Sequence, residues 1–188
     1  ILLDGCQYKY KYLLFNILQG TSPLSRPHCP AFYHAETAQR EITAAGAKVQ
    51  LQRYPGGHGW HGNVILHRDG LNLIESGRIE LPCVEPRGAV RARFGALEVV
   101  GVHLALTRGT RAKQIRALKN HAERHRGPLI IAGDFNEWRT GAVPPGATMV
   151  APGKSFHSAR PVAALDRFFT FGAVEVLSSS VHHSPNAK

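Results

Sequence analysis

Two apolar runs constrain this chain more than any other feature. Residues 97–106 form a near-continuous apolar run that contains His103, and residues 128–132 form a shorter run that ends abruptly in Gly133-Asp134-Phe135-Asn136. Strands that are buried on both faces of a sheet carry such continuous runs, whereas strands with one face in water alternate between apolar and polar residues. The sequence therefore predicts two central strands of a sheet that is covered on both sides.

The rest of the pattern adds more strands than helices. A helix is predicted at residues 111–124, where apolar residues share one stripe, and a shorter helix at 34–45, just before Gly46. Further strands are predicted at residues 9–16, 49–52, 63–67, 78–81, 88–94, 165–171 and 174–177. Since there is no internal repeat and no linker long enough to separate two units, we expect residues 1–188 to form a single domain.

The charge balance points to an acidic partner. Lys and Arg number 23 against 13 Asp and Glu, which gives a net charge of +10. A single domain this basic is expected to face nucleic acid, phosphate esters or an anionic membrane surface, although a solvated basic surface would have the same composition. No apolar run approaches the roughly 18 residues of a transmembrane segment. Three cysteines are too few for a disulfide scaffold and favour a cytoplasmic location. The oligomeric state cannot be predicted.

Polar side chains interrupt or end the predicted strands at three places. Asp134 and Asn136 follow the shorter apolar run, His103 lies inside the longer one, and Asp166 precedes Arg167 in the last long strand. An acid two residues before an Asn can hold a nucleophile with one group and a developing anion with the other. Each signal also has a structural alternative, since Gly-Asp-x-Asn suits a turn, a His in an apolar strand can be a core residue, and an acid next to an Arg can be an ion pair.

Taken together, these motifs resemble the endonuclease/exonuclease/phosphatase superfamily, which includes apurinic endonucleases, nonspecific deoxyribonucleases and inositol polyphosphate phosphodiesterases. The resemblance rests on residues 12–17, 62–66, 85–88, 103–104, 133–136, 155–156 and 165–167. It is specific over residues 62–181 and thin over residues 1–61, where Asn16 is the only anchor. The resemblance implies an α/β (α+β) fold in which two sheets pack as a sandwich flanked by helices, in four layers α-β-β-α, incomplete at one edge.

The resemblance also implies roles for individual residues in a phosphodiesterase or nuclease-like phosphoric ester hydrolase that uses Mg²⁺ or Mn²⁺. Asn16 would lie near the metal, and Asp134 would align the attacking water and help to deprotonate it. Asn136 and His103 would stabilise the charge on phosphorus, and Asp166 would orient the general-base histidine. Phosphodiester hydrolysis requires these three elements: a Lewis acid, an activated water and donors to the phosphoryl oxygens. The residues that would contact the phosphate-ester or nucleic-acid substrate are Asn63, Arg87, Ser155 and Phe156.

Two motifs of the family are not found in the sequence. The family places a metal-binding Glu at the end of its second strand, and residues 17–34 contain no such strand. The family also ends in Ser-Asp-His, whose His is the general base, whereas this sequence ends shortly after His182 and His183. Because acid–base catalysis alone contributes about 10²–10⁴-fold, we expect weak or no turnover from these 188 residues.

Two other functions are compatible with parts of the sequence. Residues 54–62 resemble the last catalytic turn of α/β-hydrolase carboxylesterases, with His58 as the general base, but the Gly-x-Ser-x-Gly nucleophile elbow is absent from the sequence. The second alternative is a non-catalytic module that binds nucleic acid through phosphate contacts. Arg91 and Arg93, on one face of a predicted strand, and the basic residues of the helix at 111–124 would supply them.

Overall fold

The computed structural model describes residues 2–4, 11–14, 47–51, 63–68, 71–82, 88–139, 141, 143–156 and 160–182. Eleven strands and one helix lie in this part of the chain. They are β1 (Leu2–Asp4), β2 (Lys11–Leu14), β3 (Ala47–Leu51), β4 (Asn63–Arg68), β5 (Leu73–Ile79), β6 (Ala89–Phe94), β7 (Leu97–His103), α2 (Arg108–Arg124), β8 (Leu129–Asp134), β9 (Ala147–Val150), β10 (Asp166–Phe171) and β11 (Ser180–His182).

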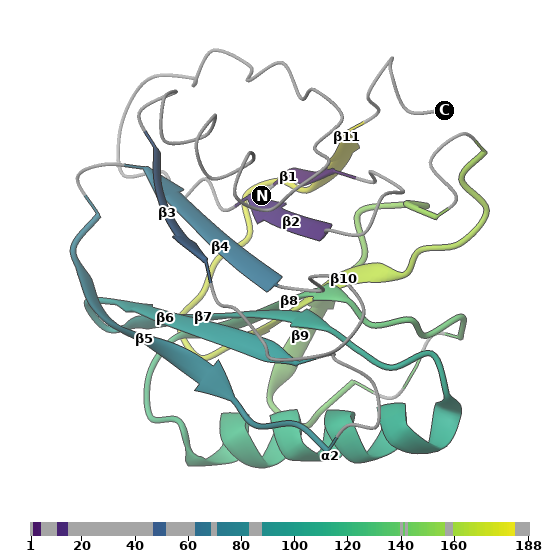
Figure 1. Cartoon of the computed structure of the whole chain (residues 1–188), viewed down its shortest axis with the longest axis horizontal. Coiled ribbons are helices and arrows are strands. Elements are labelled where there is room, and N and C mark those ends of the chain that lie inside the picture. Colours follow the sequence, from purple (N-terminus) through teal and green to yellow (C-terminus); the bar gives the residue numbers. More distant parts are fainter. Residues whose placement is uncertain are drawn as a thin grey trace.

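The strands form two mixed sheets. One has five strands in the order β11-β1-β2-β4-β3, and the other has six in the order β5-β6-β7-β8-β10-β9. The sheets face each other, since β4 contacts β6 and β7 and β2 contacts β8. Helix α2 lies on the opposite side of the six-stranded sheet (Figure 1). The predicted mixture of strands and few helices is therefore correct. The helix predicted at 34–45, which would supply the fourth layer, lies outside the described residues.

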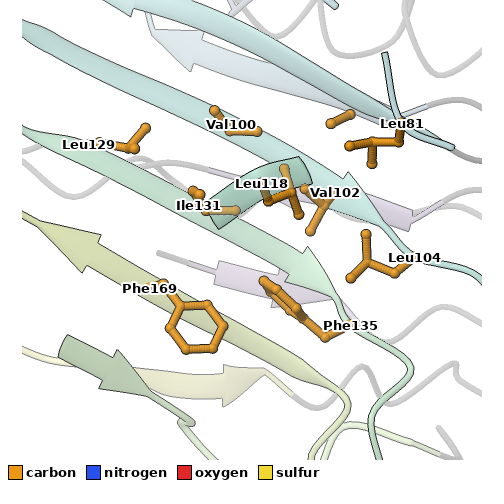
Figure 2. Packing of buried hydrophobic residues seen from close by; sticks show 10 residues of the cluster. Leu81, Val100, Val102, Leu104, Leu118, Leu129, Ile131, Phe135 and Phe169 are labelled. Atoms are coloured by element: carbon orange, nitrogen blue, oxygen red, sulfur yellow. The ribbon is translucent and has the colours of Figure 1, made fainter. Parts of the chain in front are cut away.

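The two apolar runs are the central strands that the sequence predicts. β7 and β8 pair in parallel in the middle of the six-stranded sheet, and every residue of β8 is buried. One apolar cluster, which includes Val99 and Ile130, packs with Ile65 of β4 between the sheets. A second cluster, which includes Val100 and Ile131, packs on the other face around Leu118 of α2 (Figure 2). Burial on both faces explains why neither strand alternates.

Several element boundaries differ from the prediction. Helix α2 begins at Arg108, one turn before the apolar stripe becomes visible in the sequence. The strand predicted at 78–81 is β5, which begins at Leu73, and the pattern does not predict β1, β9 or β11. The strand predicted at 174–177 is absent. Gly172, with φ of +71°, turns the chain there, the Val174 N–H donates to the Gly172 carbonyl, and Leu177 is 80% exposed. An apolar pattern without a neighbouring strand to pair with does not form a sheet.

A buried acid lies at the start of β7, at the far end of the sheet from His103. Glu98 is 3% exposed, with His121 Nε2 at 2.5 Å from Oε1 and Arg91 Nη1 at 3.3 Å from Oε2. His125 Nδ1 lies 3.9 Å from Oε2. Burial by itself would raise the pKa of Glu98, but the hydrogen bond and charge of His121, with the charges of His125 and Arg91, outweigh burial and lower the pKa. This acid fastens the end of α2 to β7.

The lowered pKa of Glu98 predicts a loss of stability in acid. Because the folded-state pKa lies below the unfolded value of about 4.5, Glu98 stabilises the fold above that pH, and its contribution disappears as the pH falls through the folded-state pKa. Glu98→Gln should therefore be less stable at neutral pH and lose less on acidification, as measured by urea unfolding across the acid range. Glu123→Gln, in an exposed pair with Lys119, is the control and should behave as the parent protein. If acidification lowers the free energy of unfolding of Glu98→Gln as much as that of the parent protein, the prediction is wrong.

Candidate active site at one end of the sandwich

Three of the predicted polar residues meet at one end of the six-stranded sheet. The parallel strands β7 and β8 finish side by side, with His103 opposite Asp134 in register. The antiparallel strand β10 begins at the same end, with Asp166 opposite Asp134 on the other side. Side chains alternate along a strand, so these residues share the sheet face of Val99, Ile130 and Phe168, which is the face toward the five-stranded sheet. The site therefore lies at the end of the layer between the sheets.

Two residues of the Gly-Asp-Phe-Asn sequence, the glycine and the asparagine, suit backbone conformations that most residues avoid. Gly133 has φ of +142°, and a Cβ atom built there would lie 2.0 Å from the Val102 carbonyl oxygen. Only glycine lets β8 approach β7 so closely immediately before Asp134. Asn136 is the only non-glycine residue with positive φ in the described ranges, at +49°, a conformation that Asn tolerates better than most residues. The turn chemistry and the polar site are thus parts of one structure.

Asp134 is held by partners on both carboxylate oxygens. Oδ1 accepts the backbone N–H of Asn136 at 2.8 Å, and Oδ2 lies 3.4 Å from His103 Nε2. Asp134 is 3% exposed, whereas 24% of the His103 side chain is exposed. The carboxylate therefore holds the imidazole in position, and the imidazole is the member of the pair that an incoming molecule can reach.

Asn136 joins the two loops that follow the central strands. Its Nδ2 donates to the Leu104 carbonyl at 2.7 Å, and the Leu104 N–H donates to the Asp134 carbonyl at 2.9 Å. The side chain is 6% exposed. The structure thus gives this amide a structural contact within the site, and a role as a donor to phosphate stays a prediction.

Ser155 and Phe156 lie next to the start of β10. Ser155 Oγ accepts the backbone N–H of Asp166 at 3.3 Å, and Ser155 and Asp166 are each 7% exposed. Phe156 forms an isolated bridge with Ala163, and its ring meets that of Trp138 edge to face, with centroids 5.8 Å apart. Ser155 therefore positions the strand that carries Asp166, and Phe156 supports the exposed ring of Trp138.

Asn63 links the five-stranded sheet to the same end. It begins β4, is 7% exposed, and its Nδ2 donates to the Gly88 carbonyl at 2.6 Å. The same carbonyl accepts the backbone N–H of His103 at 3.3 Å. Asn63 and the backbone of His103 therefore share one hydrogen-bond acceptor, the Gly88 carbonyl. Three other predicted site residues, Asn16, His58 and Arg87, lie outside the described residues.

Two arginines that the sequence analysis did not select hold the loops of the site. Arg111, near the start of α2, donates to the carbonyls of Ala105 and Leu106 and pairs with Glu137 at 3.3 Å. Arg167 donates to the carbonyls of Ala164, Glu137 and Arg139, and its burial lowers its pKa. For Glu137, burial raises the pKa, but the Arg139 N–H and the charges of Arg111 and Arg167 outweigh it and lower the pKa. Only the adjacency of Arg167 to Asp166 could have hinted at this in the sequence.

The described residues do not by themselves make a metal site. Within these ranges, no three His, Cys, Asp or Glu side chains are placed to hold one ion. Carboxylate oxygens are the ligands that Mg²⁺ prefers, but both oxygens of Asp134 have protein partners. The predicted ligand Asn16 is not among the residues described. Within the same ranges, no helix is long and apolar enough to cross a membrane.

The fold agrees with the comparison to known families. A sequence model of the Endonuclease/Exonuclease/phosphatase family matches residues 10–188, nearly the whole chain. The chain belongs to this family. The match includes residues 54–62, so the segment around His58 lies within the domain of this family and not at the end of an esterase domain.

Sequence and structure relatives extend the comparison. The chain is 29% identical over 156 residues to the uncharacterized protein YbhP of Escherichia coli K12, a match that covers 79% of this chain and 56% of YbhP. The chain thus spans about half the length of this curated relative. D. rerio TDP2 complexed with a single-strand DNA product has a TM-score of 0.59 at 20% identity, covering 74% of this chain and 68% of that one. The human Nocturnin catalytic domain with bound sulfate has a TM-score of 0.56 at 16% identity, covering 72% and 64%. At these identities the two structures show the fold alone.

The basic strand proposed for phosphate contacts is not an open patch. Arg91 forms ion pairs with Glu75 and Glu98, and Arg93 Nη2 lies 3.4 Å from Glu75 Oε2. These acids neutralise the two arginines, because β5 places Glu75 beside β6 and β7 places Glu98 on its other side. The nucleic-acid-binding alternative therefore loses this pair of residues as phosphate contacts.

Proposed function

We propose that this protein is a divalent-metal-dependent phosphoric ester hydrolase of the phosphodiesterase or nuclease type. Membership of the Endonuclease/Exonuclease/phosphatase family supports the class of reaction. The observation that carries the assignment to a site is the His103–Asp134 pair next to Asp166, at one end of the sandwich. We further propose that residues 1–188 form one domain with the four layers α-β-β-α, and that the protein acts in the cytoplasm.

Hydrolysis replaces the ester oxygen on phosphorus with the oxygen of water, so one proton must leave the water and one must reach the leaving oxygen. In the proposed mechanism Asp134 aligns the water and holds His103 in position. The partly exposed imidazole of His103 donates a ring N–H to a phosphoryl oxygen and stabilises the charge that develops there. Asn136 would support the same charge if its amide exchanged the Leu104 carbonyl for the phosphate. Asp166 would orient the general-base histidine of the family's terminal motif.

The cation would be Mg²⁺ or Mn²⁺, with Asn16 among its ligands, and would act as a Lewis acid on the phosphoryl group. The remaining ligand of the family, the Glu of its second strand, is not identified in the sequence. Asn63, Arg87, Ser155 and Phe156 are proposed to line the substrate site. Of these, Ser155 and Asn63 contact the backbones of Asp166 and Gly88, which supports a positioning function. The DNA product bound to the related TDP2 structure makes nucleic acid one candidate among the phosphate esters.

The proposal is tested by following hydrolysis of bis-(p-nitrophenyl) phosphate with Mg²⁺, with Mn²⁺ and with EDTA. We expect weak turnover that requires one of the two cations and stops in EDTA, because the described side chains alone do not supply a Lewis acid. Hydrolysis of p-nitrophenyl acetate, measured in parallel, should be no faster than in buffer. Metal-independent cleavage of the acetate that disappears in His58→Ala would contradict the proposal and favour the esterase alternative.

A further inference from the structure

Three loops around the site each expose an apolar side chain close to an arginine. Leu106 follows β7 and is 62% exposed, Trp138 follows β8 and is 64% exposed, and Val162 precedes β10 and is 54% exposed. The side chains that we call the rim surface are Leu106, Arg108, Trp138, Arg139, Arg160 and Val162, all of them exposed. Within the described ranges, no ion pair involves any of its three arginines. Apolar side chains exposed together at a functional site commonly mark a binding surface.

The three loops that carry the rim surface contact one another. Arg111 joins the first loop to the second, because it donates to the Leu106 carbonyl and pairs with Glu137, the neighbour of Trp138. The ring of Trp138 meets that of Phe156, and the Val162 N–H donates to the Phe156 carbonyl at 2.6 Å. The three loops therefore form one connected border beside His103 and Asp134.

The exposed residues are also held in place. Arg167 donates to the carbonyls on both sides of Trp138, those of Glu137 and Arg139. Glu137 in turn accepts the Arg139 N–H at 3.2 Å. Because hydrogen bonds hold the residues on both sides of Trp138, the backbone of this loop is already ordered. Binding through the indole ring would therefore cost little further backbone entropy, which favours association.

We propose that the rim surface docks onto an anionic phospholipid bilayer and that the ester cleaved at the site lies at the level of the lipid headgroups. Leu106 and Val162 have no flat ring on which a nucleobase could stack, but aliphatic and indole side chains both gain by entering the boundary between headgroups and acyl chains. Arginines at that depth meet lipid phosphates, and the net charge of +10 is complementary to an anionic surface. The identity of the ester rests on the proposed function, whereas the docking does not.

Vesicle flotation tests the docking with Asp134→Asn, which prevents hydrolysis during the measurement. Binding is expected to vesicles of phosphatidylcholine with phosphatidylglycerol and not to phosphatidylcholine alone. Leu106→Ser and Val162→Ser should each weaken binding roughly tenfold. Ile74→Ser is the matched control, because Ile74 is 49% exposed in β5, at the opposite end of the sheet. It should bind as the parent protein does.

Two charge-reversal variants test the contribution of the arginines of the rim surface. Arg108→Glu, at the start of α2 near the site, should weaken binding by more than about fivefold, since each arginine near an anionic surface contributes on that order. Arg124→Glu makes the same change in charge at the other end of the helix, and it should have a smaller effect. Equal losses in the two variants would show attraction by net charge without a defined surface and would overturn the proposal.

Trp138 provides a direct readout. The sequence contains two tryptophans, so in a Trp60→Phe background the fluorescence comes from Trp138 alone. Anionic vesicles should shift the emission to shorter wavelength. The proposal would be overturned if the protein does not bind vesicles. If, in addition, Trp138→Ala binds single-stranded DNA more weakly than Leu106→Ser does, the rim surface binds nucleic acid instead. Vesicle binding without hydrolysis of any phosphate ester by the parent protein would instead refute the proposed function and leave the docking intact.

Discussion

Replacement of Asp134 by asparagine is expected to lower phosphodiesterase turnover by about 10²–10⁴-fold. The two side chains have nearly the same shape, so the buried volume is kept, and the asparagine oxygen can still accept the Asn136 N–H. What is lost is the negative charge 3.4 Å from His103 Nε2, which holds the imidazole in position. The substitution also removes the carboxylate that is proposed to align the attacking water. The measurement is kcat for bis-(p-nitrophenyl) phosphate in saturating Mg²⁺ or Mn²⁺.

Two controls distinguish this loss from a general defect. Glu123→Gln removes a carboxylate from the exposed side of α2 and should leave kcat unchanged. The melting temperature of Asp134→Asn should stay close to that of the parent protein, so that a loss of activity cannot be attributed to unfolding. Full turnover by Asp134→Asn would remove Asp134 from the mechanism. Loss of phosphodiesterase activity in His58→Ala together with its survival in Asp134→Asn would place the chemistry in a different part of the chain.

The central strands and the residues at their ends were the part of this structure that the sequence could predict. Continuous apolar runs require a strand covered on both faces, and such strands were identified at β7 and β8. Because β7 and β8 are parallel neighbours, the residues at their carboxyl ends, His103 and Asp134, had to lie together. The strands and the polar residues at their ends follow from local pattern, whereas the parallel pairing that brings them together is seen only in the structure.

The contacts that hold the site could not be predicted in this way. Arg111 pairs with Glu137, 26 residues away, and Arg167 donates to the carbonyls of Glu137 and Arg139, 30 and 28 residues away. Glu98, within an apolar run, is buried only because His121 and Arg91 reach it from α2 and β6. No periodicity marks such pairs, since each depends on which charged side chains the tertiary fold brings together. The same reason explains β9, whose pairing partner β10 comes later in the chain.

The last prediction concerns the close approach of β8 to β7 at Gly133. Gly133→Ala is expected to destabilise the protein by several kcal/mol, on the order of 3–5, because the new Cβ would lie 2.0 Å from the Val102 carbonyl oxygen and 3.0 Å from the Val102 carbonyl carbon and backbone nitrogen. These are backbone atoms of the neighbouring strand, so no side chain can move aside to relieve the contact. Urea unfolding at neutral pH measures the loss of free energy.

Gly95→Ala separates this clash from the cost of an unfavourable backbone conformation. Gly95 also has positive φ, +61°, but a Cβ built there has no atom within 4 Å. Its replacement should therefore cost only about 1–2 kcal/mol, the penalty of the left-handed conformation for an ordinary residue. If the two variants lose the same free energy, β7 and β8 can separate at this end without penalty. The register that brings His103 opposite Asp134 would then not depend on the contact of Gly133 with Val102. A larger loss for Gly133→Ala, with reduced turnover in whatever fraction remains folded, would show that the same contact sets both the stability of the sheet and the spacing of the candidate catalytic pair.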